Sequence, residues 1–145
     1  MLRMLARRLC KLAGRAMTYW LGMDNPEVWE ASRRKYDLSN RHPFGFPTGR
    51  RKSVQKMKIG DRIANYITQP HSCFFAVWEI TNGYHIIEDN VLAGTLFPEC
   101  VEVQPLIIRS PEKGIKNNWV ISVRMSAVRL KDDVGEEILT ALQRD

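Results

Sequence analysis

The chain has few cysteines and no long apolar run. Cys10, Cys73 and Cys100 lie far apart and include no Cys-x-x-Cys pair, which argues against a disulfide framework and fits a reducing compartment. For Cys73 and Cys100 we favour the interpretation of buried, neutral thiols. No stretch approaches the roughly 18 consecutive apolar residues of a membrane-spanning helix, so no membrane partner is expected.

Signatures of catalysis are also scarce. His42, His71 and His85 have no cysteine or second histidine at the spacing of a metal site, and the His-x-Glu and Pro-Cys-x-x-Cys pattern of zinc deaminases is missing. The sequence contains neither Gly-x-Ser-x-Gly nor a glycine-rich phosphate-binding loop. We therefore predict no catalytic residue, no metal and no cofactor, and we lean towards a protein that is not an enzyme.

The composition is that of a folded domain with one strongly basic segment. Of 145 residues, 44% are hydrophobic and 26% are charged, which suits a single domain with a substantial core. The net charge is +6, yet residues 63–145 contain seven basic and eleven acidic residues. Residues 33–62 contain ten basic residues and only two acidic ones. This asymmetry favours a localised site for a polyanion, although a solvated charged surface would give the same pattern.

Residues 1–16 differ from the rest of the chain. They contain five basic residues, no acid and leucines at helical spacing, as in a mitochondrial transit peptide, but they are short and contain no serine. We interpret them as a basic amphipathic extension outside the fold and residues 17–145 as the domain. The expected location is the cytoplasm, or the mitochondrion if residues 1–16 are a targeting segment.

Apolar periodicity and turn residues predict the following elements. Strands are expected over 18–23, 62–68, 73–81 and 99–109, and helices over 26–35, 51–57 and 134–142. Asn25 and Pro26 suit the start of the first helix, and Asp132 or Asp133 is expected to cap the last one. Residues 37–47 are predicted as loop, and residues 84–96 and 119–128 stay unassigned. Short strands without a βαβ rhythm predict an α+β fold with a small curled sheet and flanking helices.

Aromatic side chains stand close to the basic segment in sequence. Phe44-Gly45-Phe46-Pro47 precedes the basic run, and the strands that follow contain Tyr66 and Trp78. Aromatic faces beside cations suit the capture of a nucleobase on a phosphate backbone.

An ordered set of short motifs resembles the EVE family of the PUA-like superfamily. The set comprises Tyr19-Trp20-Leu21, Asn25-Pro26, Phe44-Gly45-Phe46, Met57-Lys58-Ile59-Gly60-Asp61-Arg62 with Tyr66, the strands 75–81 and 101–106, and Trp119 before the last helix. Many relatives have tryptophan at Phe44 and glycine at Ala76. The resemblance implies a PUA-like mixed β pseudo-barrel that binds nucleic acid, with a modified DNA cytosine or a modified RNA base flipped into an aromatic pocket.

The candidate site residues fall into two groups. The candidates for ligand binding are Trp20, Asn25, Phe44, Gly45, Phe46, Tyr66 and Trp78, and those for phosphate binding are Arg50, Arg51, Lys52, Lys56 and Lys58. Several have competing structural interpretations: Trp20, Tyr66 and Trp78 as core residues, and Asn25 as a helix cap. The short helix near Arg51 would also offer its N-terminal amides to a phosphate.

Two other functions stay open at this point. One is a metal-independent ribonuclease using Lys58, Arg62 and Tyr66, and the other is a protein-interaction module with an acidic partner. The resemblance also implies that a nuclease or translocase partner would be encoded separately. A monomer is the default expectation.

Overall fold

The computed structural model describes residues 17–144, so the interpretation of residues 1–16 lies outside the described part of the chain. The strands are β1 (Tyr19–Asp24), β2 (His42–Phe46), β3 (Arg62–Ile67), β4 (Cys73–Ile86), β5 (Val91–Leu92), β6 (Thr95–Leu96), β7 (Glu99–Ile108), β8 (Ile115–Lys116) and β9 (Val128–Leu130). The helices are α2 (Pro26–Lys35), α3 (Arg51–Val54) and α4 (Asp132–Gln143), with 3-10 turns η1 (Thr48–Arg50) and η2 (Pro111–Lys113).

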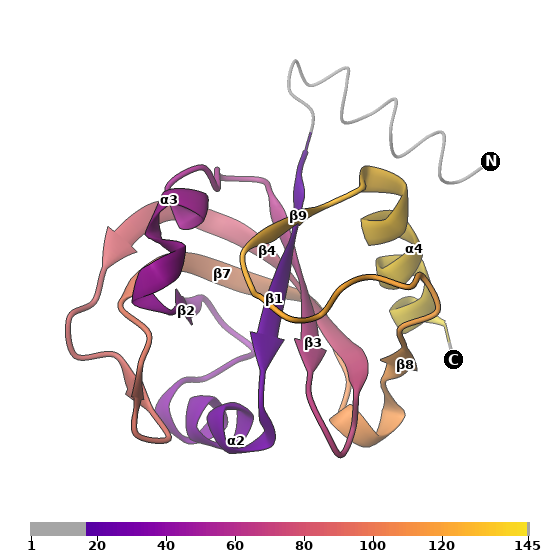
Figure 1. Ribbon diagram of the computed structural model, residues 1–145, viewed down its shortest axis with the longest axis horizontal. Coiled ribbons are helices and arrows are strands. Elements are labelled where there is room, and N and C mark those ends of the chain that lie inside the picture. The colour runs from indigo at the N-terminus through magenta and orange to yellow at the C-terminus, as the bar shows by residue number, and fades with distance from the viewer. Residues whose placement is uncertain (1–16, 145) are drawn as a thin grey trace.

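Within this part of the chain, seven strands form one curled sheet (Figure 1). Its order is β2-β7-β4-β3-β1-β9, with β8 beside one end of β4. Only β1 and β3 run parallel, with Tyr19 opposite Arg62 and Asp24 opposite Ile67. The fourteen-residue β4 shifts register several times against β7, which lets one long strand bend with the sheet. The predicted α+β pseudo-barrel with flanking helices is confirmed.

Alternate strand residues supply two apolar clusters on opposite faces of the sheet. On one face Trp20, Ile63 and Trp78 pack with residues of α2 and α3, and on the other Tyr19, Ala64 and Val77 pack with α4. In Figure 1, α2 and α3 accordingly lie to the left of the central strands and α4 to the right. No helix among residues 17–144 is long and apolar enough to cross a membrane.

Several predicted elements agree with the structure and others do not. The first strand and first helix are confirmed, and Asn25 caps α2 by accepting a hydrogen bond from the backbone N–H of Val28 at 2.8 Å. The last helix begins at Asp132, with Lys131 at the cap position, so the prediction that an aspartate caps it was wrong. Asp132 and Asp133 instead lie in the first turn, where acids suit the helix dipole.

The prediction of a loop over 37–47 was wrong for residues 42–46. Residues 42–46 form β2, an edge strand hydrogen-bonded to β7, with Phe44 opposite Val101 and Phe46 opposite Glu99. Proline and glycine in this segment suggested a loop, but an edge strand tolerates both because one side of its backbone needs no partner strand. Residues 119–128, which had no assignment, are mostly irregular, and β9 begins only at Val128.

Two features of the sequence find their reason in the structure. Gly135 lies in the first turns of α4, where glycine has a low helix propensity, but a Cβ there would collide with the ring of Tyr19, so the bare backbone lets α4 rest on that ring. The Gly60-Asp61 turn depends instead on backbone conformation and hydrogen bonds. Gly60 adopts a φ of +91°, and the carboxylate of Asp61 accepts hydrogen bonds from the backbone N–H groups of Thr18 and Lys58 and from the indole N–H of Trp20.

Replacement of Asp61 should therefore weaken the fold in graded steps. In Asp61→Ala three donors lose their acceptor, and we expect a loss of about 2–4 kcal/mol in the free energy of unfolding, measured by urea denaturation. Asp61→Asn keeps one carbonyl acceptor and should lose less. Equal stability of Asp61→Ala and the wild type would show that the carboxylate does not hold the turn.

Candidate functional site

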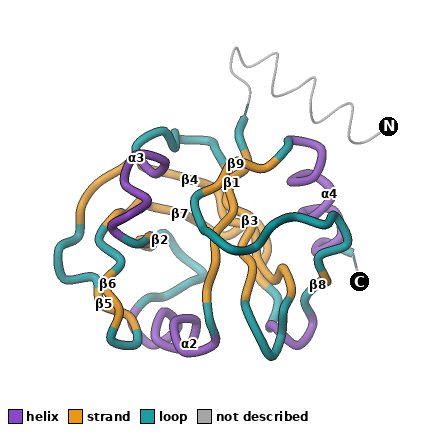
Figure 2. Tube along the Cα trace, viewed as in Figure 1, coloured by secondary structure: helices purple, strands orange, loops and turns teal. Residues whose placement is uncertain are grey.

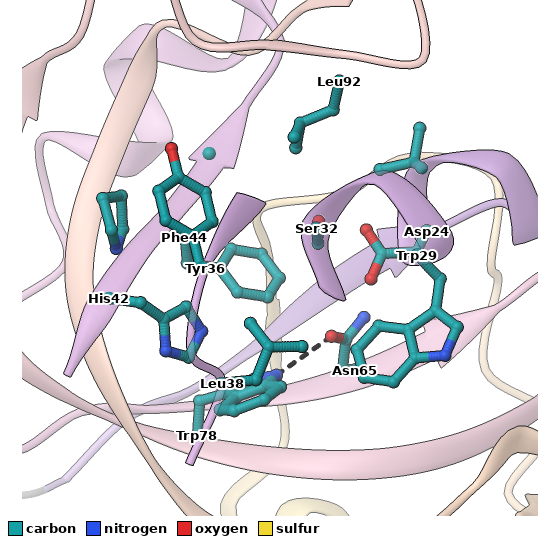
Figure 3. Close-up of a pocket in the computed structure, with 13 residues that line it drawn as sticks. Asp24, Trp29, Ser32, Tyr36, Leu38, His42, Phe44, Asn65, Trp78 and Leu92 are labelled. Carbon is teal, nitrogen blue, oxygen red and sulfur yellow. Dashed lines mark hydrogen bonds between the residues drawn. The ribbon is translucent and has the colours of Figure 1, made fainter. Parts of the chain in front are cut away.

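A small pocket opens between α2, β2 and the inner face of the sheet (Figure 3). Its cavity volume is about 30 Å³. Aromatic and polar side chains alternate around it: Trp29, Tyr36, His42, Phe44 and Trp78 form the walls, with Asp24, Ser32 and Asn65 among them. Leu38, from the loop between α2 and β2, and Leu92 of β5 complete the lining together with Val28, Pro43 and Gly45.

A hydrogen bond between two buried side chains orients the polar side of the pocket. The indole N–H of Trp78 donates to Oδ1 of Asn65 at 2.9 Å. This bond assigns the oxygen of the Asn65 amide, and its Nδ2 lies 3.4 Å from the backbone carbonyl of Tyr66. Asn65 also lowers the pKa of Asp24. In Figure 3 the carboxylate of Asp24 lies above Asn65 and faces the pocket. The three side chains come from β1, β3 and β4, so the register of the sheet determines their arrangement.

The electrostatic environment keeps the pocket uncharged or acidic. Burial raises the pKa of the Asp24 carboxyl to about 7, and the hydrogen bond from Asn65 opposes this rise only in part. Nδ1 of His42 lies 2.8 Å from the carbonyl of Asn40, which can only accept, so this nitrogen carries the proton. Burial lowers the pKa of His42 and favours its neutral form. No lysine or arginine of residues 17–144 lines the pocket.

A buried asparagine attaches the β5–β6 hairpin to the rest of the pocket. Oδ1 of Asn90 accepts from the hydroxyl of Tyr36 at 2.7 Å and from Nζ of Lys35 at 3.3 Å, and its Nδ2 donates to the carbonyl of Phe97 at 2.9 Å. A Cβ at Gly45 would lie 2.6 Å from Nδ2 of Asn90, so the glycine allows this close approach to β2. The hairpin thereby lies beside α2 (Figure 2) and brings Leu92 to the pocket.

The structure brings together some of the predicted ligand-binding residues. Phe44, Gly45 and Trp78 line the pocket, whereas Trp20, Asn25, Phe46 and Tyr66 do not. Both phenylalanine rings of β2 are buried in a strand and do not lie in the loop predicted for this segment, and they pack against each other with centroids 5.1 Å apart.

The other predicted ligand-binding residues, which do not line the pocket, make structural contacts elsewhere in the fold. Trp20 is buried and bonded to Asp61, Asn25 is the cap of α2, and Tyr66 packs against Phe74 in the cluster on the other face of the sheet. The ribonuclease hypothesis required Lys58, Arg62 and Tyr66 at one site. Instead, Nη1 of Arg62 donates to the hydroxyl of Tyr19 at 2.8 Å and lies 3.5 Å from Glu136, so its guanidinium already has buried partners.

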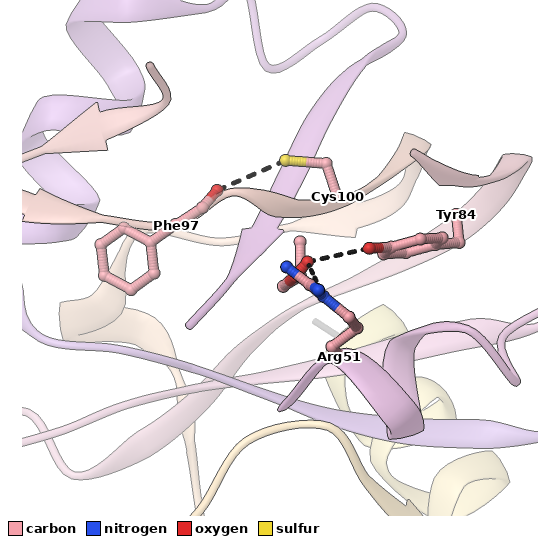
Figure 4. Close-up of polar contacts among 5 residues, drawn as sticks. Arg51, Tyr84, Phe97 and Cys100 are labelled. Atoms are coloured by element: carbon pink, nitrogen blue, oxygen red, sulfur yellow. Dashed lines mark hydrogen bonds and ion pairs between the residues drawn. The ribbon is translucent and has the colours of Figure 1, made fainter. Parts of the chain in front are cut away.

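The predicted phosphate-binding residues divide into two kinds. Nε of Arg51 lies 3.0 Å from the fully buried carboxylate of Glu99, which also accepts from the hydroxyl of Tyr84 at 2.9 Å (Figure 4). Arg50 donates to the backbone carbonyls of Ser126 and Ala127. Lys52, Lys56 and Lys58 are exposed. The two arginines thus have structural contacts, and the lysines present their charge to solvent.

Sequence reasoning missed most of the pocket. Asp24, Asn65, Tyr36 and His42 were not among the candidates, although Asn65 offered a signal as a polar residue inside the otherwise apolar strand Ile63–Ile67. Both described cysteines are buried, as predicted, and burial raises the pKa of Cys100 to about 11. Within residues 17–144, no group of three or more His, Cys, Asp or Glu side chains is placed to hold a metal ion.

Comparisons with known proteins identify the fold. No family model and no curated protein matches the sequence. Among solved structures, the chain is similar to protein Atu2648 of Agrobacterium tumefaciens, with a TM-score of 0.56, 18% identity, and coverage of 87% of this chain and 93% of that one. The similarity shows that the two chains share a fold, in agreement with the curled sheet and flanking helices that the resemblance in sequence implied.

Two further similar structures contain nucleic acid. Human THYN1, solved in complex with DNA containing 5-methylcytosine, has a TM-score of 0.58 and 13% identity over 88% of this chain and 99% of that one. The YTH domain of Zygosaccharomyces rouxii MRB1, solved with N6-methyladenosine RNA, has a TM-score of 0.62 and 10% identity over 89% of this chain and 86% of that one.

The raised pKa of Asp24 leads to a prediction about stability. A carboxyl whose pKa is higher in the folded than in the unfolded chain stabilises the fold most at pH values below its unfolded pKa of 3.8. This stabilisation is lost as the pH rises towards the folded pKa of about 7. Asp24→Asn removes the charge and keeps an acceptor for Asn65. At pH 8 we expect it to raise the free energy of unfolding by about 1–2 kcal/mol, and at pH 4 to leave it nearly unchanged.

Urea denaturation at both pH values checks this prediction. Asp37→Asn is the matched control. Hydrogen bonds from Ser39 lower the pKa of exposed Asp37, so this variant should show no increase in the free energy of unfolding at pH 8. A destabilised Asp24→Asn protein at pH 8 would contradict the assignment of Asp24 as a weakly solvated acid with a raised pKa.

Proposed function

We propose that this protein binds nucleic acid and holds one base, flipped out of its stack, in the pocket beside Trp78 and Asp24. The observation that supports this most directly is the pocket itself, which combines aromatic walls with an oriented set of polar groups and, among the described residues, no cation. Aromatic faces stack on any base, and a few fixed polar groups select among bases by their edges. The proteins of the same fold solved with 5-methylcytosine DNA and N6-methyladenosine RNA support the class of ligand.

Basic residues near the pocket suit a phosphate backbone outside it. Arg33, Arg34, Lys35 and Arg41 lie on α2 and the loop that follows, close to the pocket in the chain. Lys52 and Lys56 lie on or just after α3, which packs against the same cluster of apolar residues. The described lining of the pocket contains no cation, which favours a neutral base inside it. The surface around it is rich in cations, which favours phosphates outside.

Entry of a base requires the pocket to widen. A cavity of about 30 Å³ has room only for ordered water. Leu38 and Leu92 are the apolar lining residues that lie outside the seven-stranded sheet and α2, on a loop and on the β5–β6 hairpin. A base therefore displaces these two side chains, and the aromatic walls stay in place.

Removal of one aromatic wall should weaken binding of the preferred base. We expect Phe44→Leu to lower affinity by roughly 5- to 100-fold, since stacking of a base on an aromatic ring contributes about 1–3 kcal/mol. Fluorescence anisotropy with single- and double-stranded DNA and RNA, each with plain, methylated and hydroxymethylated cytosine and with N6-methyladenine, measures this change. Phe46→Leu is the matched control, because Phe46 lies two residues along the same strand and does not line the pocket. Equal losses from both variants would contradict a base in this pocket.

Removal of surface charge should act differently. Lys52→Glu and Lys56→Glu are expected to weaken binding to all oligonucleotides alike, and the salt dependence of log affinity should fall by about 0.7–0.9 for each phosphate that a lysine no longer neutralises. Arg51 is unsuitable for this test because it pairs with buried Glu99. Unchanged affinity and salt dependence in both lysine variants would place the phosphate backbone elsewhere.

A further inference from the structure

A larger hollow adjoins the pocket on the other side of Leu38. It has a cavity volume of about 330 Å³ and lies between α2, the loop that follows α2 and the end of β7. The pocket and the hollow share the side chains of Trp29, Tyr36 and Leu38. The residues that line the hollow but not the pocket are Arg33, Asp37 and Ile108. The two spaces are therefore separated by a single wall of three side chains, whose pocket side is visible in Figure 3.

Leu38 is the member of this shared wall that is free to move. The ring of Trp29 packs edge-on against Phe75 with centroids 4.6 Å apart, and the hydroxyl of Tyr36 is bonded to buried Asn90. Leu38 lies in the loop between α2 and β2 and is only partly buried against the apolar cluster. Displacement of this one side chain joins the small pocket to the larger hollow and leaves both aromatic rings in place.

Arg33 is the basic residue among the described lining of the hollow. Its guanidinium lies over the ring of Trp29, 6.0 Å from the centroid, and its Nη1 donates to Glu30 at 3.0 Å. Both side chains of this ion pair are about half exposed, at 55% and 52%, and an exposed pair of this kind contributes little. A phosphate can therefore replace Glu30 as the partner. The acid of the hollow, Asp37, already accepts hydrogen bonds from the loop residues that follow it.

Trp29 adds an unused donor to the shared wall. The residue is only 7% exposed, and its indole N–H is buried with no hydrogen-bond partner in the described part of the chain. Buried polar groups nearly always have a partner, so this donor points to an acceptor supplied by a ligand or by water. A sugar or phosphate in the hollow brings such acceptors beside the ring.

We propose, on the basis of the function proposed above, that the hollow holds the sugar and phosphate of the captured nucleotide, with Arg33 bound to the phosphate and Leu38 as the gate through which the base enters the pocket. A base and its phosphate are joined by one sugar, so the phosphate must lie in a space directly beside the pocket, as the hollow does. Arginine suits this contact because its planar guanidinium presents paired donors to phosphate oxygens.

Neutralising one phosphate of the ligand tests the contact with Arg33. A methylphosphonate linkage replaces one charged oxygen by a methyl group, and it is placed immediately 5′ or 3′ of the central base that binds best in the oligonucleotide panel above. Fluorescence anisotropy of the full chain at low salt then compares modified and unmodified oligonucleotides. The wild type should lose affinity about two- to fivefold at one of the two positions, which is the range of an exposed ion pair.

The variants determine which side chain bears this effect. Arg33→Gln should bind the modified and unmodified oligonucleotides equally well, because it has no charge to pair with the phosphate. Arg34→Gln is the matched control, since Arg34 is the next residue of α2 and does not line the hollow. Whatever its overall affinity, it should keep the wild-type response to the modified linkage. Circular dichroism confirms that each variant is folded.

Association kinetics test the gate. Leu38→Ala should speed up association of the preferred oligonucleotide by about three- to tenfold, because the open state no longer has to form first. Leu92 lines the pocket but not the hollow, so Leu92→Ala should speed up association less. The reverse order of the two rates would place the entrance at the β5–β6 hairpin and overturn the gate.

The outcomes distinguish this inference from the proposed function. A wild type that ignores both modified linkages, or an Arg33→Gln variant that responds to them as the wild type does, would overturn the hollow as the phosphate site. The loss expected for Phe44→Leu would still stand in that case, and with it the base in the pocket. Failure of the wild-type chain to bind any oligonucleotide would overturn both proposals.

Discussion

The carboxylate of Asp61 is the contact on which the arrangement of the sheet depends. It lies in the turn before β3 and accepts hydrogen bonds from Thr18, at the start of β1, and from the indole of Trp20. The two strands are thus aligned at one end, and their parallel pairing carries this alignment along six residues. Since a slip of one residue would turn every side chain to the other face, the same contact also determines which residues reach each apolar cluster.

The candidate site stands at the far end of this strand pair. Asp24 is the last residue of β1, and Asn65 reaches it from β3, where it is held by Trp78 of β4. A carboxyl placed there lies among aromatic rings, and no lysine or arginine of residues 17–144 lines the pocket, which is why burial dominates its pKa. The fold therefore places a pocket whose described lining contains no cation inside a protein whose net charge is +6.

The basic segment contributes to structure as well as to the surface. Arg51 neutralises Glu99, a fully buried carboxylate that would otherwise destabilise β7, and Arg50 bonds with the backbone before β9. Lys52 and Lys56, only a few residues away, are exposed. A run of basic residues in a sequence therefore contains residues of two kinds. Only their contacts in the folded structure distinguish the arginines that hold α3 from the lysines that are available to a polyanion.

The sequence by itself determined the α+β class, the positions of β1, α2 and the central strands, and the cap at Asn25, because each follows from periodicity or from contacts between residues close in the chain. Local composition misassigned 37–47 as loop, since pairing of β2 with β7 depends on residues more than fifty positions away. Of the pocket, the sequence predicted Phe44, Gly45 and Trp78. Asp24 belongs to no motif that would single it out, and it meets Asn65 in the pocket because β1 pairs with β3, a register set by long-range contacts. Only the tertiary structure brings these two residues together, and only burial there changes the chemistry of the acid.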